Sequence, residues 1–224
     1  WGPLPAAGVA GAAFATLGTQ SLAALIGMAL LASGKYGIHV HLRDFRPDVA
    51  FIKRAFTLGF PASIEQSTRA LGMTVMTFLM ASFGTVTVAA FGMGINVLSF
   101  VIIPAMGLSM ATSALVGQNI GAGQIARADS IARLSATVAF VSLSVLGAVV
   151  FVGATPLMAF FVPTDEAVVT SAATFLRTVA PTFGFVGLQL ALTGVFRAAG
   201  NMVVAMTLAL VSQWVIQFPL AYFL

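Results

Sequence analysis

Residues 70–126 read ALGMTVMTFLMASFGTVTVAAFGMGINVLSFVIIPAMGLSMATSALVGQNIGAGQIA, a run without a single Asp, Glu, Lys or Arg. Further charge-free runs cover 1–34, 134–164 and 198–224. A stretch of about 18 such apolar residues is already long enough to suggest a transmembrane helix. Over all 224 residues, 7% are charged and 59% are hydrophobic, and the mean hydropathy is +1.05. The sequence therefore predicts an integral membrane protein.

The glycines, prolines and charges divide the chain into six predicted spans. These spans cover 4–33, 56–83, 86–118, 132–162, 167–196 and 202–224. We expect each span to be a helix, because an open sheet would leave backbone groups without hydrogen bonds in lipid. The alternation typical of a lipid-facing β-barrel is also missing from the sequence. The predicted fold class is an all-α polytopic membrane protein with six transmembrane helices.

Basic residues gather on alternate connections between these spans. The eight concerned are Lys35, Arg43, Arg46, Lys53, Arg54, Arg127, Arg133 and Arg197. The opposite connections contain only Asp165 and Glu166. Because basic loops stay on the cytoplasmic side, the eight basic residues are predicted to face the cytoplasm. The same rule accounts for the net charge of +4 without a nucleic-acid partner.

An acidic residue lies inside the second span. Glu65 is about nine residues past the start of this span, or ~14 Å along a helix, and Arg69 follows four residues later on the same face. An unpaired charge at this depth would cost at least about 3 kcal/mol, so both side chains are expected to face the interior of the bundle. The pair, with Gln66 beside it, is either a binding site for a coupling ion or a static ion pair that holds helices together.

Each of the six predicted spans contains a proline, and Pro61, Pro104 and Pro181 are among them. Pro61, Pro104 and Pro181 each remove a backbone donor and are expected to kink their helices. Pro61 precedes Glu65 by four residues, so the acid is predicted to lie beside a disrupted turn. A kinked, polar, acidic span near the bilayer centre is typical of a transporter site.

Further side chains are candidates for a substrate cavity. Met73 and Met76 follow Glu65 at helical spacing, and flexible thioethers suit varied apolar ligands, although ordinary packing explains them as well. Asn96 and Gln189 lie mid-span, where each is a ligand contact or an interhelical hydrogen bond. Arg177 lies nearer the outer surface and is expected to extend toward water.

The remaining residue patterns give no indication of a cofactor or an enzyme. The chain has no Cys, and His39 and His41 have no acidic or Cys cluster near them in the sequence. No Ser/His/Asp set, paired carboxylate site or phosphate-binding loop is visible. We therefore expect neither a metal site nor a membrane-embedded enzyme.

Four segments resemble the multidrug and toxic compound extrusion (MATE) family. The most specific is PAMGLSMATSALVGQNIGAG at 104–123, followed by Arg127-Ala128, which is similar to the second helix of a lobe. GFPASIEQ at 59–66 resembles the start of the second lobe, GVFRAAGN at 194–201 its fourth helix, and GVAGAAFAT at 8–16 the last helix of the first lobe. The residues that match the family motif are Gly117, Gln118, Asn119, Gly121 and Arg197.

This resemblance implies a transporter of twelve helices in two lobes, of which the chain supplies the sixth to eleventh. On that mapping, 1–34 is the last helix of the first lobe, 35–55 a cytoplasmic linker and 56–224 five helices of the second lobe. We therefore expect the chain to be a piece of a longer protein. Some family members carry a cation-binding acid where this chain has Arg69, and a second near Val186, so that two-carboxylate sodium site is absent.

The function implied by the resemblance is secondary active efflux of cationic or amphipathic drugs or toxic metabolites, in exchange for protons or sodium, by alternating access. On this hypothesis Glu65 helps to bind the coupling ion, Arg69 tunes it, and Arg197 is a cytoplasmic anchor. The expected protein is a monomer in the plasma (inner) membrane. A flippase for lipid-linked precursors is the nearest alternative, and an enzyme or a scaffold that transports nothing is less favoured.

Overall fold

The computed structural model describes residues 8–33, 47–162 and 165–223, and every regular element among them is helical. The elements are α1 (Gly8–Ser33), α2 (Val49–Ala81), α3 (Thr85–Gly121), α4 (Ile125–Phe161), α5 (Glu166–Val179), η2 (Ala180–Thr182), α6 (Phe183–Ala198), α7 (Met202–Leu210), η3 (Val211–Gln217) and α8 (Phe218–Phe223). The contacts divide the chain into two units, Trp1–Lys53 and Arg54–Leu224. In the first unit, α1 is a helix of 26 residues without a charged side chain.

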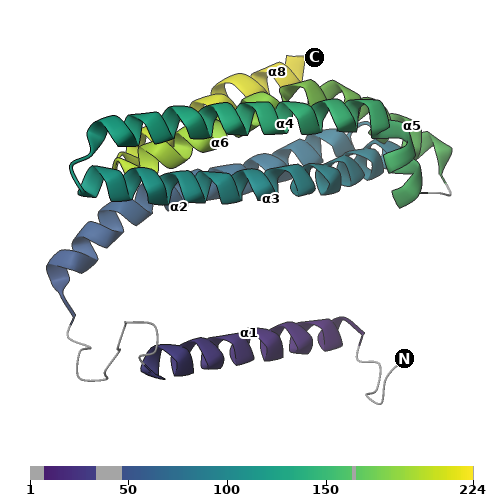
Figure 1. Ribbon diagram of the computed structural model, residues 1–224. Helices are drawn as coiled ribbons and strands as arrows, with labels where there is room; N and C mark the ends of the chain where they lie inside the picture. Colours follow the sequence, from purple (N-terminus) through teal and green to yellow (C-terminus); the bar gives the residue numbers. More distant parts are fainter. Residues whose placement is uncertain (1–7, 34–46, 163–164, 224) are drawn as a thin grey trace. The chain divides into compact units, whose positions relative to one another are not determined.

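Helices α3, α4, α5 and α6 form the core of the second unit. The two long helices α3 and α4 pack against each other, and each also packs against α5 and α6 (Figure 1). Between them lie buried apolar side chains, among which Met158, Leu176 and Phe183 are almost completely inaccessible. This core is narrow, since many large apolar side chains of these helices are exposed.

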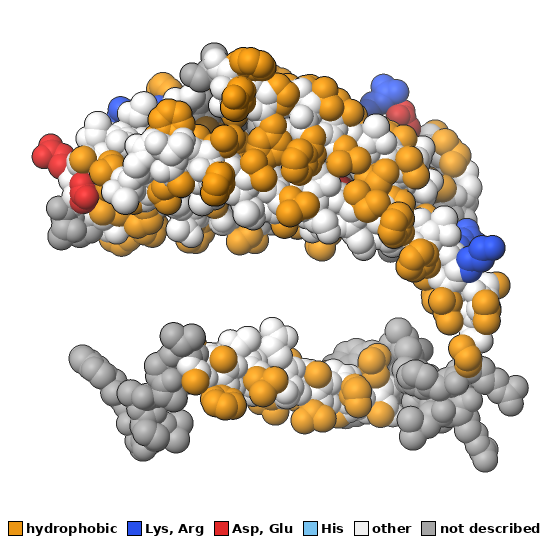
Figure 2. Space-filling view, turned by 180° about the vertical axis from the view of Figure 1, so that it is seen from behind, with side chains coloured by type: hydrophobic (Ala, Val, Ile, Leu, Met, Phe, Trp, Pro, Cys, Tyr) orange, Lys and Arg blue, Asp and Glu red, His pale blue; other side chains and the backbone are white. Residues whose placement is uncertain are grey.

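The outer surface of the second unit is suited to lipid. Hydrophobic side chains cover much of the face seen in Figure 2, while charged side chains gather toward the ends. By length and composition, five helical stretches among the described residues can cross a membrane. They are Ala10–Ser33, Thr85–Gly121, Ile125–Phe161, Glu166–Ala198 and Met202–Phe223. Helix α2, the remaining predicted span, is as long but is interrupted by charged and polar residues.

Two turns at corresponding ends of helices have the same geometry. After α3, the amide of Gly123 donates to the carbonyl of Ile120, and that of Gln124 to Asn119 at 2.8 Å. After α6, Gly200 donates to Arg197, and Asn201 to Phe196, in the same pattern. The φ angles of Gly123 and Gly200 are +73° and +75°, which favour glycine. The GAG and AAG sequences thus end both helices in the same way.

Two helices begin well before the spans predicted for them. Helix α2 begins at Val49 rather than 56, because the Asp48 carboxylate accepts hydrogen bonds from the amides of Ala50 and Phe51 at 2.9 and 3.2 Å. The last residues of the predicted linker, 49–55, are therefore helical, whereas 34–46 lie outside the described residues. Helix α4 begins at Ile125 rather than 132, so Arg127 and Arg133 are helical.

The prolines act differently from one another. At Pro181, the 3-10 turn η2 separates α5 from α6. Helices α2 and α3 continue without a break through Pro61 and Pro104, and kinks at these two residues stay predictions. The last span contains a feature that was not predicted, the π-helical segment η3 between α7 and α8.

Candidate functional site

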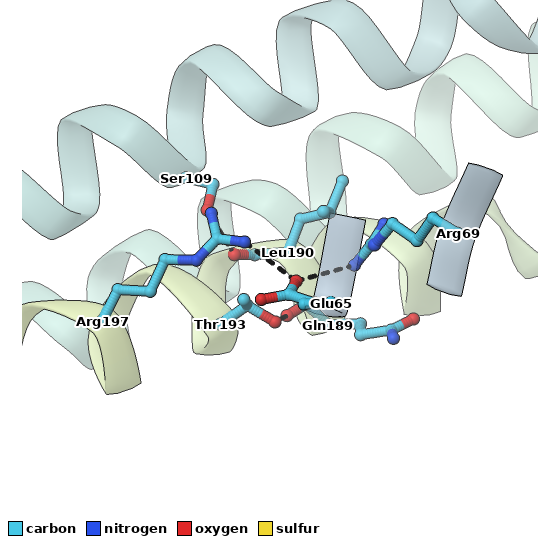
Figure 3. A network of polar contacts seen from close by, with 7 residues as sticks. All are labelled: Glu65, Arg69, Ser109, Gln189, Leu190, Thr193 and Arg197. Carbon is cyan, nitrogen blue, oxygen red and sulfur yellow. Dashed lines mark hydrogen bonds and ion pairs between the residues drawn. The ribbon is translucent and has the colours of Figure 1, made fainter. Parts of the chain in front are cut away.

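The Glu65 carboxylate lies at the centre of an ion cluster between α2 and α6. Its side chain is 1% exposed, and Oε1 accepts from Nη2 of Arg197 at 2.8 Å and from Nη2 of Arg69 at 3.5 Å. Figure 3 shows the two guanidinium groups reaching the carboxylate from opposite sides. The predicted pairing of Glu65 with Arg69 is confirmed, although Arg197 is the nearer partner.

Three polar atoms of this cluster have no hydrogen-bond partner among the described residues. They are Oε2 of Glu65 and Nε of both Arg69 and Arg197, and each is almost inaccessible. The cluster combines two cations with one anion, so its formal charge is +1. It therefore presents a free acceptor and two free donors, with one positive charge in excess.

Close packing of α3 against α6 positions Arg197. The Ser109 hydroxyl of α3 donates to the Leu190 carbonyl of α6 at 2.6 Å. One turn further along α6, a Cβ on Gly194 would lie only 2.5 Å from the Ser109 carbonyl oxygen. Glycine thus permits the two backbones to approach, and Arg197 follows three residues later at the end of α6.

A small cavity of about 30 Å³ opens beside the ion cluster. Its polar walls are Gln66, Arg69, Ser109 and Arg197, and its apolar walls are Met106, Met110 and Leu190. Gln66, predicted from its place next to Glu65, lines this cavity, and its role in ion coupling stays a prediction. No carboxylate is among the lining residues of this cavity.

None of the four predicted substrate-cavity residues lines the cavity beside Glu65. Asn96 is exposed and donates to the Gly92 carbonyl of its own helix at 3.1 Å. Met73 is half exposed and Met76 less so, and neither lines the cavity beside Glu65. Gln189 lines a separate hollow of about 320 Å³ between α6, α7 and η3. A substrate role for these four residues stays a prediction.

Several residues of the family motif contribute to helix packing or to the turn after α3. A Cβ on Gly117 would lie 3.9 Å from the Cβ of Ala198, so this glycine faces the end of α6. The backbone carbonyls of Gln118 and Asn119 accept hydrogen bonds in the turn after α3, whereas Gly121 has open space around it. Arg197 contacts Glu65, and its expected role as a cytoplasmic anchor stays a prediction.

Other predicted positions lie apart from this site. Arg177 is exposed and donates to the Thr155 hydroxyl at 3.0 Å, consistent with the expected outward orientation. His39 and His41 lie outside the described residues. Among the residues that are described, no group of three His, Cys, Asp or Glu side chains is placed to hold a metal ion.

The bundle of apolar helices defines the chain as a polytopic integral membrane protein. The family model named MatE matches residues 61–223, and the chain therefore belongs to the MatE family. This match confirms the resemblance inferred from the motifs and the all-α membrane fold. With bacterial relatives of the same family, it agrees with the predicted location in the plasma (inner) membrane.

Similar proteins include two bacterial relatives. The probable multidrug resistance protein YpnP of Bacillus subtilis is 29% identical over 215 residues, which cover 95% of this chain and 47% of YpnP. The probable multidrug resistance protein NorM of Rhizobium meliloti is 29% identical over 227 residues, covering 97% and 48% of the two chains. The chain thus spans about half the length of the curated relatives that it matches.

Solved structures show the same fold at lower identity. The bent form of the MATE transporter VcmN of Vibrio cholerae superposes with a TM-score of 0.76 at 22% identity, covering 85% of this chain and 43% of that chain. An outward-facing multidrug resistance MATE transporter gives a TM-score of 0.88 at 21% identity, covering 97% and 49%. At these identities the likeness concerns the fold alone.

Proposed function

We propose that the chain is part of a secondary active transporter that exports cationic or amphipathic compounds in exchange for protons or sodium, by alternating access. Membership of the MatE family supports this function, as do relatives named multidrug resistance proteins. Those names do not favour a lipid-linked precursor flippase or a membrane enzyme. We further propose that the transporter works as a monomer.

The observation that carries the proposal is the buried Glu65 carboxylate, which joins α2 to α6 through Arg197. A carboxylate in an apolar span is costly unless it is compensated, so such residues usually serve a function. Oε2 of Glu65 has no partner among the described residues and is the free acceptor for a coupling ion. A proton or sodium ion bound there neutralises the carboxylate and weakens its attraction for both arginines.

In this mechanism the ion pair is a reversible contact between two helices. When Glu65 is ionised and unoccupied, Arg197 holds α2 against the end of α6. When the coupling ion binds, the hold weakens and α2 is free to move relative to α6. Arg69, as the second and more distant cation, limits the strength with which the coupling ion is held.

The test is drug efflux by the full-length protein in proteoliposomes under imposed proton or sodium gradients. Replacing Glu65 with Gln keeps the shape of the side chain but removes its charge, and is expected to abolish gradient-dependent dye export. The matched control is Arg133→Gln, which breaks an exposed ion pair with Asp129 at 2.9 Å and leaves the cluster intact. Wild-type export by Glu65→Gln would exclude Glu65 from coupling, and an absence of gradient-driven export in the wild type would reject the proposed function.

A further inference from the structure

We propose that the small cavity beside Glu65 binds a small monovalent anion, a halide or formate, held by Arg69 and Arg197. This site goes beyond the proposed export function, because an anion is neither the coupling ion nor a cationic drug. Its walls contain two guanidinium groups, an amide and a hydroxyl, and no carboxylate. The nearby acid, Glu65, accepts from both arginines through a single oxygen.

The charge balance favours an anion. Helix α2 contributes Glu65 and Arg69 to the cluster, α6 contributes Arg197, and α3 has no charged residue at all. The remaining described acids of the second unit are Asp129, near the start of α4, and Asp165 and Glu166, at the start of α5. None of these three pairs with Arg69 or Arg197. One positive charge is therefore left over in the cluster, and an anion held by both guanidinium groups would neutralise it.

The free donors of the cluster point to the same ligand. Nε of Arg69 and Nε of Arg197 are buried N–H groups without an acceptor among the described residues. An anion supplies an acceptor and also neutralises the excess charge, whereas a water molecule supplies only the acceptor. A monovalent ion brings the cluster to zero, while a divalent one would leave it at −1.

The size and accessibility of the cavity also agree with a small ion. Its volume of about 30 Å³ exceeds the roughly 10–15 Å³ that a cavity needs to hold one water molecule. It therefore suits a chloride ion or the head of a formate ion rather than a large organic anion. The Arg69 and Arg197 side chains are 37% and 30% exposed, so an ion can reach them from outside.

The test is anion binding to the purified full-length protein in detergent, without any gradient. The thermal unfolding midpoint is measured against increasing sodium chloride or sodium formate, at an ionic strength held constant with sodium gluconate. We expect a saturable rise of the midpoint with either small anion, since ligands stabilise the state that they bind. The bulkier gluconate serves as the reference anion, and an equal response to all three anions would overturn the proposal.

Variants assign the effect to this cavity. In Arg69→Gln, which removes one charged donor, the apparent affinity for chloride is expected to fall about tenfold or more. Gln66→Glu places a carboxylate in the wall without removing an arginine, and is expected to abolish binding even if Arg69→Gln fails to fold. Arg133→Gln is the control with unchanged binding. Chloride affinity unaltered in either cavity variant would overturn the site.

This equilibrium measurement is separate from the export assay. If chloride binds and the cavity variants weaken its binding as expected, the anion site stands even when the protein exports no dye. Conversely, normal export without saturable anion binding would reject only the anion site.

Discussion

Replacing Arg197 with Gln is the most informative perturbation of this structure. The substitution removes the 2.8 Å contact with a carboxylate that is only 1% exposed. Removing one partner of a fully buried ion pair costs about 3–5 kcal/mol, because the other charge is left uncompensated. Here Arg69 still lies 3.5 Å from the same oxygen, and the Arg197 side chain is 30% exposed. We therefore expect the free energy of unfolding to fall by about 2–3 kcal/mol, near that of a strong charged hydrogen bond.

The assay is denaturant unfolding of the full-length protein in mild detergent, followed by tryptophan fluorescence, on a double-mutant cycle with Glu65→Gln. Once the carboxylate is neutral, Arg197→Gln should cost less than about 1 kcal/mol, because residues in one ion-pair network are coupled. Arg133→Gln is the matched control, since its exposed pair with Asp129 is worth about 0.3–0.5 kcal/mol. The reasoning is refuted if Arg197→Gln costs no more than this control, or costs the same whether or not Glu65 is present.

Two glycine substitutions, each with a control, test the packing of α3 against α6 and the turn after α3. All are measured by the same unfolding assay. Gly194→Ala places a Cβ 2.5 Å from the Ser109 carbonyl oxygen and is expected to destabilise the protein by about 1–3 kcal/mol. In contrast, Gly107→Ala, whose Cβ meets nothing within 4 Å, should be neutral or slightly stabilising, and equal effects of the two would contradict the close approach of α3 and α6. Gly123→Ala forces alanine into a φ of +73° and should cost about 1–2 kcal/mol, whereas its neighbour Gly121→Ala, with negative φ and open space, should not. A loss no greater in Gly123→Ala than in Gly121→Ala would argue against the left-handed turn.

The order of the helices could be predicted from the sequence because lipid imposes a simple rule on composition. Charge-free runs of sufficient length must be helical, and the basic and acidic residues between them mark most of the connections. Helix starts were harder to place. The Asp48 carboxylate that begins α2 follows a proline, a recognisable capping signal. Arg127 and Arg133 resemble loop residues, yet an exposed first turn of a long helix accommodates such charges equally well.

Half of the candidate site could be predicted, for a geometric reason. Glu65 and Arg69 are four residues apart on one helix, a spacing that places their side chains together whatever the rest of the fold does. Arg197 is 132 residues away from Glu65 along the chain, and no spacing rule connects them. The signal in the sequence was the excess of basic over acidic residues. That excess makes other arginines of the chain candidates for a second contact with Glu65.

The contact of α2 with the last span has a consequence for how this chain tolerates changes of length. A Cβ on Gly72 would fall on the side-chain amide of Gln213, which lies in the π-helical segment η3. A π-helical turn contains one more residue than an α-helical turn, since its hydrogen bonds join residues five apart. Deleting one residue there would restore a regular α-helical turn, and the residues downstream would keep roughly their present faces, because the wider turn already contains the extra residue. The residues after Gln217 would then keep their present neighbours, so natural variation within this segment is expected to include the loss of one residue as well as substitution.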